Sequence, residues 1–190
     1  MAPRRPAVVK RTTPCGSAPR RIVDNPKVWS SLRLFVAIAG LAGAFGGVPA
    51  GAQSNNVRIT QLSDVAFGSI ANLGADSIRT QNICVFAHTA SNGYRVTASG
   101  SAPGGAFALS SGASLLAYEV QWNSAAGQTS GSTLSANVSL TGQVSTATHQ
   151  TCNNGPSTSA SLILVLRSAA LMSARAGSYS GTLTLLIGPE

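Results

Sequence analysis

The chain has 190 residues and carries 13 Lys and Arg against 5 Asp and Glu, a formal net charge of +8. The positive excess lies in residues 1–52, because residues 53–190 contain no lysine and only five arginines against four acidic residues. Nucleic-acid binding depends on clustered basic side chains that neutralise phosphates, and these five arginines are scattered along the sequence. The charge distribution therefore excludes nucleic acid as a partner.

Residues 1–52 have the layout of a secretory signal peptide with a long basic n-region. The basic stretch is followed by an apolar run from Leu34 to Val48 and by Ala50-Gly51-Ala52, a small-residue pattern that signal peptidase accepts. The alternative is a membrane anchor, but the run falls short of the roughly 18–20 residues needed to span a bilayer. We predict cleavage after Ala52, secretion, and no integral membrane anchor in the mature protein.

The rest of the chain alternates apolar and polar residues with a period of two, which predicts strands rather than helices. In chain order, the expected strands lie at residues 65–67, 83–86, 94–99, 107–109, 115–122, 134–141, 162–166 and 179–187. One helical turn is expected at residues 169–175. Turn residues such as Asn92-Gly93 and Asn154-Gly155-Pro156 separate the runs. This pattern predicts an all-β fold, an antiparallel β-sandwich.

Aromatic residues in these strands have two interpretations. Trp122 and the tyrosines are the residue types of a sugar-stacking platform. However, Tyr94, Tyr118 and Tyr179 lie in phase with the apolar face of their strands. Core packing is therefore the favoured interpretation.

Cysteine usage fits secretion. Removal of residues 1–52 takes away Cys15 and leaves only Cys84 and Cys152, an even count in an exported chain. We predict a disulfide between them; the alternative is two unpaired buried thiols.

No constellation for catalysis is visible in the sequence. His88 and His149 are the only histidines, and two histidines without a supporting carboxylate make at best a weak metal pair. The acidic residues are far apart in sequence, so no general acid and base pair is evident. There is no Gly-x-Ser-x-Gly nucleophile motif. We predict no catalytic, metal or cofactor-binding residues, and a protein that is not an enzyme.

Short motifs follow one another in a recognisable order through residues 53–190. They are Phe67-Gly68, Cys84 opening a strand, Tyr94-Arg95-Val96-Thr97 before Gly100, Phe107 and Leu109 before Gly112, Leu116-Ala117-Tyr118-Glu119-Val120, Cys152, and Ala176-Gly177-Ser178-Tyr179 before the last strand. With the export signal and the cysteine pair, this order resembles the spore coat protein U domain family. That family includes subunits of archaic chaperone–usher pili.

The resemblance implies an immunoglobulin-like sandwich that lacks its last strand. A periplasmic chaperone supplies the missing strand first, and the N-terminal extension of the next subunit then supplies it. This is β-strand addition, in which alternate side chains fill a groove. The resemblance also implies an usher as a partner and a final location at the cell surface. It divides the chain into a donor segment at 53–63 and a sandwich domain at 64–190. The donor residues would be Val57 and Ile59, and the acceptor edge would be formed by Tyr179, Leu183, Leu185 and Ile187.

Three functions follow from these observations. The leading one is a non-catalytic structural subunit of a surface fibre or pilus. The second is a free-standing secreted surface or coat protein, or a carbohydrate-binding module, and the third is a small secreted enzyme. The donor segment distinguishes the first two, because a binding module would fold residues 53–63 onto its own sheet. The family often has Asp where this chain has Gly181.

Overall fold

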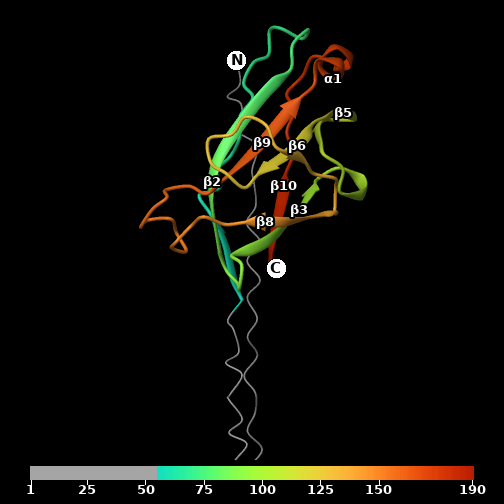
Figure 1. The fold of residues 1–190 in the computed structure, drawn as a ribbon. Coiled ribbons are helices and arrows are strands. Elements are labelled where there is room, and N and C mark those ends of the chain that lie inside the picture. The colour runs from blue at the N-terminus through green and yellow to red at the C-terminus, as the bar shows by residue number, and fades with distance from the viewer. Residues whose placement is uncertain (1–54) are drawn as a thin grey trace, which may run out of the picture. The chain divides into compact units, whose positions relative to one another are not determined.

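The computed structural model describes residues 55–190, which form an all-β fold of antiparallel sheets (Figure 1). The expected signal peptide, its cleavage site and the first residues of the donor segment lie outside the described residues. The strands are β1 Asn56–Thr60, β2 Ser77–His88, β3 Gly93–Gly100, β4 Ala108–Ser111, β5 Ser114–Ala117, β6 Glu119–Asn123, β7 Ser132–Thr133, β8 Ser139–Val144, β9 Ala160–Leu166 and β10 Leu183–Pro189. A 3₁₀ turn at Pro103–Gly105 and the helix α1 Ser168–Ser173 complete the fold.

The first sheet has the order β1-β2-β9-β6-β7. Its central strand, β9, pairs with β2 on one edge and with β6 on the other. Every residue of β9 is buried, as expected for a continuous apolar run rather than an alternating one. The expected strand at 162–166 is therefore confirmed, and it lies at the centre of the sheet.

The second sheet has the order β10-β3-β8, and its apolar face shares one core with the first. Tyr94 of β3 and Trp122 of β6 meet between the sheets: the Trp122 Nε1 donates to the Tyr94 hydroxyl at 3.2 Å. The rings pack edge to face at 6.3 Å. Burial raises the pKa of Tyr94 to about 12. Two aromatic residues that were candidates for stacking on a sugar therefore pack in the core instead.

The strand expected at 134–141 is wrong as a single element. Leu134, just after β7, donates its backbone N–H to the Val120 carbonyl of β6 at 2.8 Å, whereas residues 139–141 belong to β8, which pairs with β3. The chain therefore passes from one sheet to the other. The crossing precedes Asn137, because Ala136 already bridges Ala98 of β3. Asn137 has a left-handed φ of 63°, a region that asparagine tolerates, and it interrupts the alternation before β8. Its side-chain amide donates to the Gly104 carbonyl at 2.8 Å. Val138, expected on the buried face, is consequently exposed.

Three further expectations change in the structure. Residues 65–67 form no strand, although Val65 and Phe67 pack against the core. The expected strand at 115–122 is two strands, β5 and β6, whose shared face is nevertheless buried. The last strand begins at Leu183 rather than at residue 179. The expected helical turn is α1; within residues 55–190, no helix has both the length and the apolar composition to cross a membrane.

Candidate functional site

An apolar groove, here called the edge groove, opens between residues 65–73 and residues 174–183. It has a volume of about 740 Å³. Figure 1 shows α1 and the segment before β2 at the same end of the described chain, and both contribute to the groove. Its apolar side chains come from loops, strands and helix together: Val65, Phe67, Ile70, Leu73, Leu109, Leu116, Tyr118, Leu164, Leu166, Leu171, Tyr179 and Leu183.

The first wall of the edge groove is held by side chains of β2 rather than by a backbone ladder. Arg79 donates to the carbonyls of Ala66 at 3.2 Å and Phe67 at 2.9 Å. Its guanidinium also lies 5.9 Å from the centre of the Phe67 ring. Gln81 donates to the Ser63 carbonyl at 3.2 Å. Long side chains of β2, rather than backbone hydrogen bonds, therefore connect this wall to the sheet.

The second wall is tied to the β4–β5 hairpin. Ser180 exchanges two backbone hydrogen bonds with Ser110, at 2.8 and 3.0 Å. Next to it, Gly181 approaches β4 so closely that a Cβ there would lie 3.1 Å from the Ala108 carbonyl oxygen. A larger residue at this position would push the wall away from the hairpin. Close packing against β4 therefore explains why a glycine fits at position 181.

The floor of the groove is the apolar face of the first sheet. Leu164 and Leu166 of β9 lie beside Leu116 and Tyr118, all of them buried. Burial raises the pKa of Tyr118 to about 12, and its ring packs at 5.9 Å from that of Phe107. The floor offers shape and apolar area but no group that exchanges a proton near neutral pH.

The predicted donor residues lie in β1, which pairs with β2 of the same chain. Val57 is opposite Ala87, and Ile59 is opposite Val85. Both side chains pack against the main core. β1 ends at Thr60, and the next residue, Gln61, has a left-handed φ of 65°. The segment expected to serve another molecule is therefore accommodated within its own sheet.

The predicted acceptor residues lie at the edge of the second sheet. β10 pairs only with β3 among the described strands, and its other side faces β1 without a ladder. Leu183 is buried, whereas Leu185 and Ile187 are partly buried against the core. Tyr179 lies outside the strand, in the groove wall, and its hydroxyl donates to the Arg175 carbonyl at 3.0 Å.

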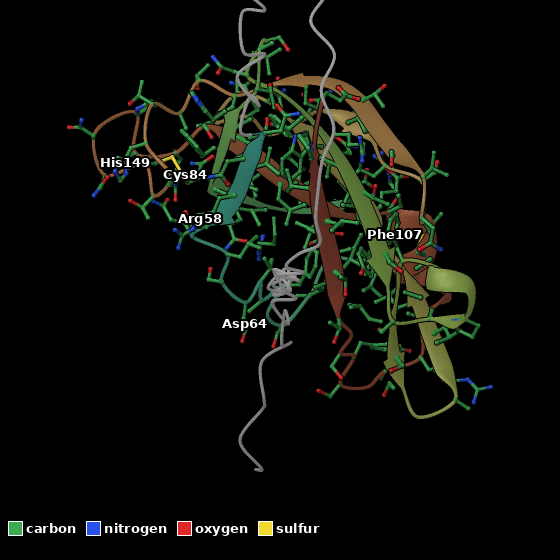
Figure 2. All side chains as sticks on the ribbon, turned by 90° about the horizontal axis from the view of Figure 1, so that it is seen from below. Arg58, Asp64, Cys84, Phe107 and His149 are labelled. Atoms are coloured by element: carbon green, nitrogen blue, oxygen red, sulfur yellow. A yellow bond between two sulfur atoms is a disulfide. The ribbon has the colours of Figure 1, made fainter. Side chains whose placement is uncertain are left out.

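The predicted disulfide is confirmed: Cys84 and Cys152 are joined, with their Cα atoms 5.9 Å apart. Ile83 and Val85 point into the main core, so Cys84 points to the opposite face of the sheet. There it packs with Cys152, Ala147 and Phe86 in a second, smaller cluster. Figure 2 shows the disulfide on the same side as Arg58 and His149.

Three charged residues that are far apart in the sequence form an ion cluster. Arg167 contacts Asp76 at 2.8 Å and Glu119 at 2.5 Å. The backbone N–H of Ser168 and the Arg167 guanidinium hold the pKa of Asp76 below its usual value. The hydrogen bond from Arg167 does the same for Glu119. Two carboxylates do come together, but the arginine between them makes this a structural contact rather than an acid and base pair.

Each histidine contacts a residue close to it in the sequence. His88 stacks on Phe86, and the His149 Nδ1 lies 3.1 Å from the Thr151 hydroxyl. Among residues 55–190, no three His, Cys, Asp or Glu side chains gather in a way that would hold a metal ion.

No family model matches the sequence, and a search of curated proteins finds no match. The resemblance to the spore coat protein U family therefore stays a prediction from the motifs, and the edge groove is the candidate functional site.

Proposed function

We propose that the protein is a non-catalytic structural subunit of a secreted surface fibre that accepts a strand from a partner at the edge of β10. One observation supports the proposal: among the described strands β10 lies at the edge of its sheet, with the apolar edge groove beside it. In β-strand addition the backbone of the edge strand supplies hydrogen bonds, and alternate side chains of the added strand fill apolar pockets. An immunoglobulin-like sandwich with one strand missing has these two features.

The same proposal includes the route to the surface. Export would begin with cleavage after Ala52, and a periplasmic chaperone, an usher and neighbouring subunits would be the partners. An uncovered apolar edge favours aggregation, so a partner strand is needed during transit. These partners follow from the motif resemblance to the spore coat protein U family.

Donation by Val57 and Ile59 requires one additional step in this chain. Because β1 is paired with its own β2, the segment has to leave that strand before it can serve another molecule. Gln61, with its left-handed backbone, lies at the point where such a segment would swing away. The donated strand would place the two apolar side chains toward the neighbour's core.

The test is a synthetic peptide covering Gln53 to Ser63, added both to the intact protein and to a variant lacking those residues. Strand addition at β10 raises the melting temperature of both proteins, whereas simple replacement of β1 raises only that of the truncated variant. A peptide with Val57→Asp and Ile59→Asp is the control, because an unpaired charge cannot enter an apolar groove. A photoreactive group at the Val57 position should crosslink to residues 183–189. Crosslinks confined to residues 84–88 would refute the proposal.

A second function is favoured by the pairing of β1 with β2. A free-standing secreted surface or coat protein would keep this segment on its own sheet, as observed. A carbohydrate-binding version gains no support from Trp122, which is 1% exposed. A stable monomer that ignores the peptide would favour this second function.

A further inference from the structure

The edge groove has a charged group at its rim that strand addition does not use. Residues 55–190 contain five arginines. Four have hydrogen-bonded side chains: Arg58 contacts Gln150, Arg79 the 66–67 carbonyls, Arg95 the Pro189 carbonyl, and Arg167 two carboxylates. Among the described residues, the guanidinium of Arg175 has no such partner. It is exposed and contributes to the groove lining.

Several backbone groups of the second wall are already hydrogen bonded. Both the N–H and the carbonyl of Ser180 bond to Ser110, and the Thr182 N–H bonds to the Ser101 hydroxyl at 3.1 Å. The Arg175 carbonyl accepts from Tyr179. An apolar chain needs no hydrogen bonds from this wall.

The volume of the groove, about 740 Å³, falls within the range of small-molecule sites. Such sites are mostly apolar, with a few polar groups that fix the orientation of the ligand. Arginine is always protonated in proteins and binds carboxylate or phosphate through two parallel N–H donors. An apolar slot with one unpaired guanidinium at its mouth matches a long apolar chain that ends in an anionic group.

We propose that the edge groove binds an anionic amphiphile, with the acyl chain between residues 65–73 and 174–183 and the head group on Arg175. The chain would lie over Leu164 and Leu166 on the floor. This activity goes beyond the proposed function and does not depend on it. The ligand is either a free fatty acid or an acyl chain of an anionic phospholipid, which share this chemistry.

The test measures binding of a dansyl-labelled fatty acid to the exported protein, with palmitate as competitor. We expect saturable fluorescence that palmitate displaces. Ala176→Trp, at an exposed position that lines the groove, should abolish the signal by filling the mouth. Arg175→Gln should weaken palmitate by about tenfold, the value of one charged hydrogen bond. It should leave the neutral hexadecanol unchanged. Arg58→Gln, the matched loss of charge outside the groove, should have no effect.

Three results would overturn the proposal: no saturable binding, binding that survives Ala176→Trp, or equal effects of Arg175→Gln and Arg58→Gln. Sedimentation with phosphatidylglycerol vesicles identifies the source. Sedimentation that Ala176→Trp abolishes indicates a phospholipid chain, and palmitate binding without sedimentation indicates a free fatty acid. Sedimentation that Ala176→Trp leaves intact is surface adsorption and contradicts the proposal. The Gln53–Ser63 peptide distinguishes the two functions. If the peptide stabilises the protein but no fatty acid binds, only this inference is wrong. If a fatty acid binds but the peptide does not stabilise the protein, only strand addition is wrong.

Discussion

Removal of the disulfide should cost the fold a large part of its stability. Cys84 and Cys152 are 68 residues apart in the sequence. Loop-closure entropy assigns about 4 kcal/mol to a crosslink of this span. The bond also holds the residues around Ala147 against the outer face of the first sheet, in a cluster separate from the main core. Both sulfurs are buried, so alanine is a better replacement than serine, whose hydroxyl would need a new partner.

The variant is the double substitution Cys84→Ala with Cys152→Ala, compared with the intact protein in thermal unfolding followed by circular dichroism. For a domain of this size, 1 kcal/mol corresponds to about 3 °C, so the melting temperature should fall by roughly 12 °C. Reduction of the intact protein should produce a similar fall. Gln61→Ala is the control, because it removes only the hydrogen bonds from Gln61 to Thr151 and Ser157. A double variant within about 1 kcal/mol of the intact protein would refute the reasoning.

Three further predictions concern stability. Arg167→Gln should lower the midpoint of urea unfolding at pH 7 but have little effect at pH 3. The two carboxylates that Arg167 contacts have lowered pKa values, so the ion cluster stabilises the fold above their unfolded pKa values and loses this effect as the pH falls through their folded pKa values. Trp122→Phe should cost about 1–3 kcal/mol by leaving the Tyr94 hydroxyl without its donor, and combining it with Tyr94→Phe should cost less than the sum of the two single changes. Val57→Asp should destabilise the isolated protein much more than Arg58→Asp, since Val57 packs on the core and its neighbour is exposed; equal melting temperatures would mean that β1 does not hold to β2 in solution.

The strands could be predicted where one strand carries one uninterrupted pattern. Tyr94, Val96 and Ala98 alternate along β3 and are all completely buried. The uninterrupted apolar run at 162–166 likewise predicted the strand β9. The pattern from Leu134 to Leu140 failed, because period two persists across a point where the chain changes sheets. A local pattern shows which residues are apolar, but it does not show that the chain leaves β6 after Leu134 and meets β3 at Ala136.

The candidate site was only partly accessible to sequence reasoning. Edge residues such as Leu183 were identified, and the cysteine pair followed from its even count. The groove wall was not predictable, since Arg79 and Gln81 hold it through side chains that contact carbonyls of residues without any pattern. The role of Arg175 depends on what the other four arginines contact, which no spacing in the sequence reveals.

The central position of β9 has a consequence for how the molecule opens. Its backbone is bonded on both edges, so its amide protons should exchange with solvent only when the whole domain unfolds. Among the strands that the structure describes, β1 pairs with β2 alone. Its amides can therefore exchange by local detachment while β9 remains protected. Hydrogen exchange would in this way separate the release of an edge segment from the loss of the fold, in a single native sample.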